Sequence, residues 1–202
     1  AGAFTVASSA YGADGAGTTS WSYALGLAEG VVSGVDSGLT SGSETVYLHL
    51  VNGEVIGSTT ATTADVDDKN TVFSLAVNSS GSVTLTQNAA IDHDTDATSN
   101  YASDQEVLGT GLVNLTGMVT ITDSDGDTAT DSETLDLGGN VLFDDDGPSI
   151  TANVSDGDSI TLNTQDAEVI DTATASFAGA FTVASSAYGA DGAGTTSWSY
   201  AL

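Results

Sequence analysis

The stretch TVYLHLVNGEVI, residues 45–56, decides the fold class. Its apolar side chains alternate at Val46, Leu48 and Leu50, which is the period-two pattern of a strand with one buried face. Asn52 and Gly53 follow, and Asn-Gly is typical of the two-residue turn of a β-hairpin. The sequence therefore predicts two antiparallel strands joined by that turn.

The same alternation recurs along the chain. It occurs at Trp21/Tyr23/Leu25, Phe73/Leu75/Val77, Val83/Leu85 and Val119/Ile121. A second hairpin is predicted at the turn Ser79-Ser80-Gly81. Short strands separated by turn residues are typical of an antiparallel β-sandwich, so we predict an all-β fold of this kind. Residues 88–108 show no clear period, and there we expect a loop with a short helix.

The composition is strongly acidic. The 202 residues include 28 Asp plus Glu and a single basic residue, Lys69, which gives a net charge of −27. Such a surface repels nucleic acid and anionic lipid, and these classes of partner are excluded. Apolar residues make up 40% of the chain, so we expect it to fold, provided that cations neutralise the clustered acids. The chain has no cysteine, and disulfides and thiolate metal sites are therefore excluded.

One segment occurs twice. Residues 1–25, AGAFTVASSAYGADGAGTTSWSYAL, are repeated without change at 178–202, so that position 1 corresponds to position 178. We call this sequence the repeated segment. It indicates one 177-residue period of a tandem array. Arrays usually serve length or multivalency, since an enzyme gains little from copying its site end to end.

The boundary between repeats is predicted at the one proline, Pro148. Three aspartates and a glycine, Asp144 to Gly147, precede it and read as a linker. Residues 1–146 would then form most of one unit, and 147–202 the opening segment of the next repeat. A natural unit would begin near Ser149. The sequence leaves open whether the later segment is incomplete or completes the first sandwich.

Acidic clusters suggest metal ligands. Asp123, Asp125 and Asp127 alternate in a glycine-containing turn, where their carboxylates can converge on a hard cation such as Ca²⁺. The pattern is not an EF-hand, because Gly126 stands at the fourth position and Thr134 at the twelfth. We predict calcium ligands in this cluster and in the linker, at Asp144, Asp145 and Asp146. The acids at 65–68 and 156–158 read as solvated turns.

Catalysis is not expected. Nucleophile-elbow, zinc-protease and phosphate-loop motifs are absent, and paired carboxylates carry no information at this aspartate content. His49 reads as a sheet-face histidine. His93, amid Asp92, Asp94 and Asp96, reads as a structural hydrogen-bonding residue or as a transition-metal ligand. No small-molecule substrate is therefore expected.

Several blocks together resemble a known family. They are YGADG at 11–15, VFSL at 72–75, VTLTQ at 83–87 with AIDH at 90–93, TDSDGDTAT at 122–130 and FDDDGPS at 143–149. They resemble the tandem extender repeats of giant bacterial RTX adhesins exported by type I secretion. The resemblance implies an Ig-like β-sandwich with Ca²⁺ in or near the linkers, repeated to hold a distal ligand-binding region away from the cell for adhesion and biofilm formation. It supports the six predicted calcium ligands. The period of this chain is long for a plain extender, which suggests an inserted or split domain.

The resemblance also implies where the protein is located and which partners it has. An extender is extracellular, lies at the cell surface and is secreted without an N-terminal signal peptide. Residues 1–10 lack the basic region of such a peptide, and no apolar run is long enough for membrane insertion. The expected partners are neighbouring identical repeats of the same chain. The alternative is a carbohydrate- or surface-binding module, with Trp21, Tyr23 and Tyr11 as a stacking platform, although the alternation favours the core for Trp21.

Overall fold

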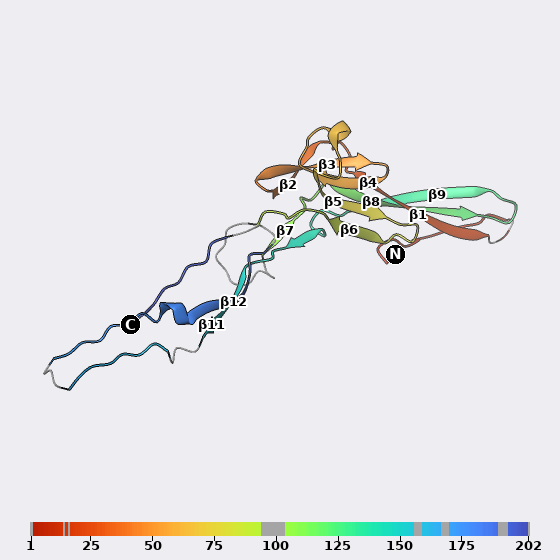
Figure 1. Cartoon of the computed structure of the whole chain (residues 1–202). Coiled ribbons are helices and arrows are strands. Elements are labelled where there is room, and N and C mark those ends of the chain that lie inside the picture. Colours follow the sequence, from red (N-terminus) through yellow and green to blue (C-terminus); the bar gives the residue numbers. More distant parts are fainter. Residues whose placement is uncertain are drawn as a thin grey trace. The chain divides into compact units, whose positions relative to one another are not determined.

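The chain forms two compact units in a computed structural model, Ala1–Asp145 (unit 1) and Asp146–Leu202 (unit 2) (Figure 1). The structure describes residues 2–13, 15, 17–93, 104–155, 159–166, 170–189 and 194–201. The elements of unit 1 are β1 (Thr18–Leu27), β2 (Val35–Ser41), β3 (Glu44–Val51), β4 (Glu54–Ser58), the 3₁₀ turn η1 (Thr63–Asp65), β5 (Thr71–Val77), β6 (Val83–Gln87), β7 (Gln105–Val107), β8 (Val113–Thr122), β9 (Thr128–Asp136) and β10 (Leu142–Asp144). Those of unit 2 are β11 (Ser149–Val154), the 3₁₀ turn η3 (Ala178–Ala180) and β12 (Phe181–Ala187).

A five-stranded antiparallel sheet in the order β2-β3-β4-β5-β6 forms one layer of unit 1. Both predicted hairpins lie in it. Asn52 and Gly53 join β3 to β4 with φ of 52° and 86°, the left-handed backbone that favours an Asn-Gly pair. Gly81 turns the chain between β5 and β6 with φ of 80°. Each turn needs a residue that tolerates positive φ, and the sequence supplies it.

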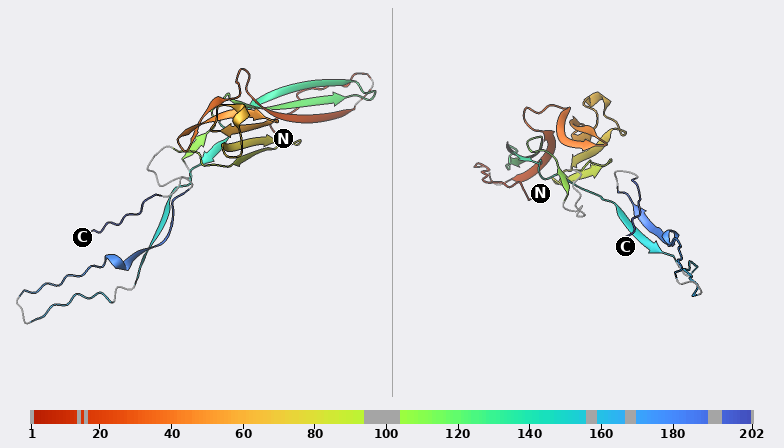
Figure 2. Two further views of the ribbon diagram at one scale, coloured as in Figure 1. Left: turned by 45° about the horizontal axis from the view of Figure 1, so that its top comes forward. Right: turned by 90° about the vertical axis from the view of Figure 1, so that its left-hand side faces the viewer.

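A three-stranded antiparallel sheet in the order β1-β8-β9 forms the other layer. β1 and β8 pair along their whole length, from Thr18 opposite Thr122 to Leu27 opposite Val113. Only one end of this sheet faces the five-stranded sheet. The other end projects past it and carries the turn between β8 and β9 (Figures 1 and 2).

The core of unit 1 lies between the two sheets. It contains Leu25, Leu39, Val46, Leu48, Val55, Val72, Phe73, Leu75, Ile91, Leu108, Val113, Leu115, Leu137, Val141 and Phe143. Phe143 on β10 packs against Phe73 with ring centroids 5.1 Å apart. β10 pairs with β7, so this short ladder closes one end of the core. Buried side-chain polar atoms of the described residues all have hydrogen-bond partners.

Unit 2 consists of the antiparallel pair β11 and β12 with long connecting segments. The prediction of an all-β, antiparallel, sandwich-like fold is confirmed. The short helix expected within 88–108 does not occur at 88–93 or at 104–108. The structure has strand β7 at Gln105–Val107. Residues 94–103 lie outside the described residues. Among the helices that the structure describes, none has the length and apolarity that a membrane span needs.

Candidate metal centre

The turn between β8 and β9 brings three predicted ligands together. Thr122 and Thr128 are the last paired residues of the two strands, and the backbone N–H of Asp123 donates to the carbonyl of Asp127 at 2.9 Å. The chain reverses through Gly126, whose φ is 100°. Because that φ is unfavourable for other residues, the glycine in the SDGD motif shapes this loop.

Asp123 organises the turn from within. Its Oδ1 accepts hydrogen bonds from the backbone N–H of Gly126 at 3.1 Å and of Asp127 at 2.8 Å. The side chain is half-buried, whereas those of Asp125 and Asp127 are exposed. One carboxylate therefore fixes the loop conformation, and the other two project into solvent beside it.

The three carboxyl groups offer one oxygen each within 4.8 Å of one another. The pKa of Asp123 is lowered, first by a hydrogen bond with the Asp125 side chain and then by the surrounding backbone N–H groups. A bond between two carboxyl groups requires a proton on one of them, because an ionised carboxylate only accepts. A divalent cation can take the place of that proton and satisfy all three groups.

An oxygen-only cluster of this kind suits a hard cation. Ca²⁺ takes six to eight oxygen ligands with tolerant geometry, so three carboxylates would supply part of its shell. A recess of about 200 Å³ adjoins the cluster and is lined by Tyr11 and Gly12 as well as by Asp123 and Asp127. Backbone from the YGADG block thus lies beside the turn. Asp14 of that block lies outside the described residues.

Sequence reasoning did not place that block here. The signal was present in Gly15 of the block and in Gly17, two residues after it, because a side chain at Gly17 would meet the backbone at the end of β8. A Cβ on Gly17 would lie 1.7 Å from the Thr122 carbonyl oxygen, and one on Gly15 would lie 3.4 Å from Ser124 Oγ. The glycines allow the block to approach the aspartate turn closely.

Within the described residues, the side chains of the linker aspartates do not form a metal-binding cluster. Asp144 ends β10, and its carboxylate accepts a hydrogen bond from the Gln105 side chain. Asp145 Oδ1 lies 3.6 Å from His93 Nδ1, and Asp146 begins unit 2. The group Asp123, Asp125 and Asp127 is the one set of three or more metal-binding side chains within the described residues.

The His93 side chain contacts residues at the C-terminal end of unit 1. Its Nε2 lies 3.0 Å from the Phe143 carbonyl, and its Nδ1 faces Asp145. Burial lowers the pKa of His93, but the Phe143 carbonyl and the negative charges of Asp145 and Asp104 outweigh it, so the pKa is raised. The structural interpretation of this histidine agrees with these contacts.

Other aspartate carboxylates accept hydrogen bonds from backbone N–H groups in tight turns. Asp92 accepts from the backbone N–H groups of Gly42 and Ser43, both at 2.7 Å, across the β2–β3 hairpin. Burial raises the pKa of Asp92, but these two hydrogen bonds, a hydrogen bond with the Thr40 side chain and the charge of His93 together outweigh it, and the pKa is lowered. Asp67 and Asp136 accept from backbone N–H groups in the same way. Asp94, Asp96, Asp156 and Asp158 lie outside the described residues.

His49 is fully buried in β3. Its Nε2 lies 2.7 Å from the Thr60 carbonyl, and its Nδ1 lies 2.9 Å from Thr63 Oγ1. The Nε2 tautomer can donate to the carbonyl and accept from the hydroxyl, so both nitrogens are used. This arrangement ties the 59–65 segment to the sheet and leaves no ring nitrogen for a substrate.

Trp21 has features of both environments that the sequence suggested, a stacking surface beside a groove and a partly buried position. It is half-buried and stacks on Tyr23, with ring centroids 6.2 Å apart and planes 9° from parallel. It also lines a groove of about 630 Å³ on the projecting end of the β1-β8-β9 sheet. The recess beside Asp123 and Asp127 shares Ala10, Ile121 and Ala129 with this groove, but Trp21 does not line it.

Comparisons with known proteins give one match. A family model described as Domain of unknown function (DUF5801) matches residues 1–138. No curated protein and no solved structure matches the chain.

Proposed function

The chain belongs to the DUF5801 family, and on the architecture of this member we propose that it is a structural, calcium-stabilised extender repeat of a bacterial surface adhesin. The observation that carries the proposal is the repeated segment, which recurs unchanged at 178–202. A chain built from identical copies gains length with each copy, and length is what a spacer provides. The repeat would project a distal ligand-binding region from the cell surface for adhesion and biofilm formation.

Calcium supplies the stabilisation in this proposal. The chain carries a net charge of −27, and three carboxyl oxygens lie within 4.8 Å at the β8–β9 turn. At low calcium these negatively charged groups repel one another. In an extracellular medium, millimolar Ca²⁺ would bind the folded turn, and affinities of about 10⁻⁴ to 10⁻³ M suit an extracellular module. The six predicted ligands remain Asp123, Asp125, Asp127, Asp144, Asp145 and Asp146, with the first three supported by their geometry.

A carbohydrate- or surface-binding module is the alternative. The groove beside Trp21 favours it, because sugars stack on exposed aromatic rings. Against it, Trp21 already stacks on Tyr23, and Phe4 packs against both rings. In the spacer interpretation these aromatic rings pack against one another, and no bound ligand is required. No substrate and no catalytic residue belong to either function.

Calorimetric melting of the full chain tests the calcium proposal. One site at about 100 times its Kd stabilises by roughly 2.7 kcal/mol, so we expect unit 1 to melt about 5–10 °C higher in millimolar Ca²⁺ than in EDTA. The double variant Asp125→Asn/Asp127→Asn should lose this shift without losing the turn, because Asp123 holds the loop.

A matched control separates binding from charge. Asp65→Asn/Asp68→Asn removes the same two charges from an exposed segment outside the cluster and should keep the calcium shift. Mg²⁺ should shift the transition less, because it retains its waters. An identical transition in Ca²⁺ and EDTA would show that calcium has no part in the stability of this unit.

A further inference from the structure

Several side-chain contacts of the repeated segment recur in both units. The contacts are Phe4–Trp21 with ring centroids 6.3 Å apart and Phe181–Trp198 at 6.2 Å, and Tyr11–Thr19 with hydroxyls 2.8 Å apart and Tyr188–Thr196 at 2.9 Å. Local sequence therefore favours these side-chain contacts in both copies. One copy of the segment is a guide to what the other can bind.

The copies differ in their strand partners. In unit 2 the copy Phe181–Ala187 is strand β12, and it pairs with β11. In unit 1 the identical residues 4–10 form no strand with any described residue. The backbone of residues 4–10 thus lacks the partner that the same sequence holds in unit 2.

A groove in unit 1 lies where that partner would go. It has a volume of about 630 Å³ and is lined by residues 3–10 on one side. The projecting sheet lines the rest, with Trp21, Val119, Ile121 and Ala129 among the lining residues. The groove is therefore a strip of unpaired backbone beside a sheet face that is apolar along β1 and β8 and polar along β9, where Thr130 to Glu133 line it.

Strand β11 has the complementary pattern. Ile150, Ala152 and Val154 alternate with Ser149, Thr151 and Asn153, so one face of the strand is apolar and the other polar. The apolar face is uncovered in unit 2, where Ile150 is 62% and Val154 63% exposed. A strand with this pattern is stable when its apolar face covers another apolar surface.

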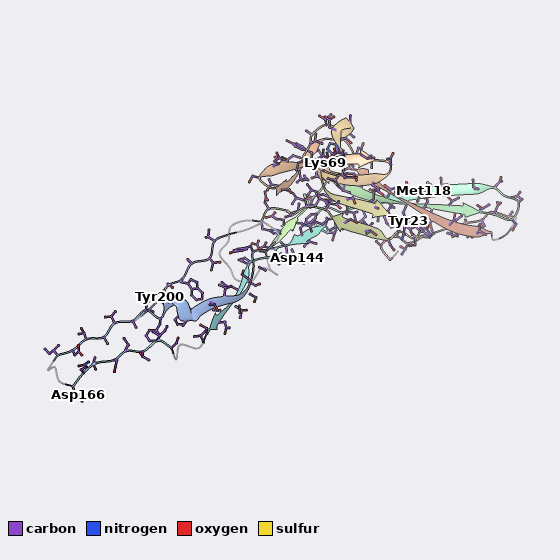
Figure 3. The ribbon with its side chains drawn as sticks, viewed as in Figure 1. Tyr23, Lys69, Met118, Asp144, Asp166 and Tyr200 are labelled. Carbon is purple, nitrogen blue, oxygen red and sulfur yellow. The ribbon has the colours of Figure 1, made fainter. Side chains whose placement is uncertain are left out.

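Aromatic side chains of the repeated segment that are exposed in unit 2 are covered in unit 1. In unit 2, Phe181 is 42% and Tyr200 60% exposed. The Tyr200 side chain is labelled in Figure 3. In unit 1 their counterparts Phe4 and Tyr23 pack against the core. Unit 1 has the sheet that covers these rings but no β11, and unit 2 has β11 but no such sheet.

We propose that the groove beside residues 3–10 binds a strand of the sequence Ser149–Val154 from another copy of the period. The pairing follows the β11–β12 register moved back by one period. Ser149 then lies opposite Ala10, and Val154 lies opposite Phe4. The main-chain hydrogen bonds resemble those of other strands that bind by adding to an unpaired edge. Each repeat of an array is completed by a strand from across the repeat boundary.

The same register brings the linker to the acidic turn. In unit 2 a Cβ on Gly189 would lie 2.0 Å from the carbonyl oxygen of Asp146, so these backbones touch. Gly189 corresponds to Gly12, which lines the recess beside Asp123 and Asp127. The incoming strand thus carries an Asp146 carbonyl to the candidate metal centre. This last step rests on the proposed calcium function, whereas the strand docking does not.

Fluorescence of the full chain tests the docking. The Trp198→Phe variant leaves Trp21 as the one tryptophan, and Trp21 lines the groove. A peptide of residues 147–155, GPSITANVS, should shift the Trp21 emission to shorter wavelength and saturate. The titration is run in EDTA, so that failure of the calcium proposal leaves the result unaffected.

A control peptide fixes the interpretation. The same peptide with Ile150→Ser and Val154→Ser keeps the backbone and the charge but loses the apolar face, and it should bind at least about tenfold more weakly. Equal binding of the two peptides, or no response to either, overturns the proposal. A chain extended at its N-terminus by residues 146–177 provides the covalent test, because it should melt higher and no longer respond to the peptide. An extended chain that melts like the original and still responds to the peptide also overturns the proposal.

Discussion

Replacing one phenylalanine in each copy of the repeated segment measures how much the surrounding unit contributes. Phe4 and Phe181 have the same neighbours in sequence and the same aromatic contacts. Phe4 also packs against the core of unit 1, where a Cβ on Gly117 would lie 2.8 Å from its ring. Phe181 is 42% exposed. The pair thus separates the contacts within the segment from those with the sheet.

The expected magnitudes follow from burial. Truncation of a fully buried phenylalanine to alanine costs about 3–5 kcal/mol, and Phe4 is half-buried. We therefore expect Phe4→Ala to destabilise unit 1 by about 2–3 kcal/mol, which lowers its melting temperature by about 4–12 °C. Phe181→Ala loses aromatic contacts on an exposed surface and should cost less than about 1 kcal/mol.

Calorimetry and urea unfolding of both variants provide the measurement. The urea midpoint should fall for Phe4→Ala with little change in slope, since the surface exposed on unfolding barely changes. Equal losses in the two variants would show that the rings pack only with one another. That result would remove the reason for treating residues 3–10 as part of the unit 1 fold.

Two further predictions concern single residues of unit 1. Because the pKa of His93 is raised in the folded state, its contribution to stability should be complete below the unfolded pKa of about 6.5 and be lost as pH rises through the folded value. Melting temperatures from pH 5 to 8 should therefore show a decline that His93→Gln removes, and the same decline in the variant would assign it to another group. Gly17→Ala should destabilise unit 1 by more than about 2 kcal/mol, because its Cβ would lie 1.7 Å from the Thr122 carbonyl oxygen. The matched change Gly194→Ala meets only the Tyr188 side chain, at 3.0 Å, and equal melting of the two variants would contradict the close approach in unit 1.

Local signals made the hairpins predictable. Asn52-Gly53 and Gly81 define turns between adjacent strands, and positive φ at these positions is a property of the residue type. The cluster of Asp123, Asp125 and Asp127 was predictable for the same reason, because one turn brings its members together. Strand alternation and turn chemistry act over a few residues, which is the range that sequence patterns cover well.

Long-range pairing was harder to predict. β7 and β10 are short strands from distant parts of the chain, Gln105–Val107 and Leu142–Asp144, so neither strand shows a period of its own. The linker aspartates look alike in sequence, yet Asp145 faces His93 while Asp144 contacts Gln105. Their partners come from segments that only the tertiary structure brings close. The position of the YGADG block beside the aspartate turn depends on the same kind of contact.

The identity of the two copies of the repeated segment also affects how an array assembles. Identical segments compete for identical partners, so a Ser149–Val154 strand fits the groove of every copy, whether or not that copy is its neighbour. Repeat proteins of this kind misassemble by exchanging equivalent elements between domains. Duplication therefore adds length and at the same time removes the differences that tell one junction from another. In the proposed array, the correct pairing of neighbours would therefore depend on the order in which the copies fold.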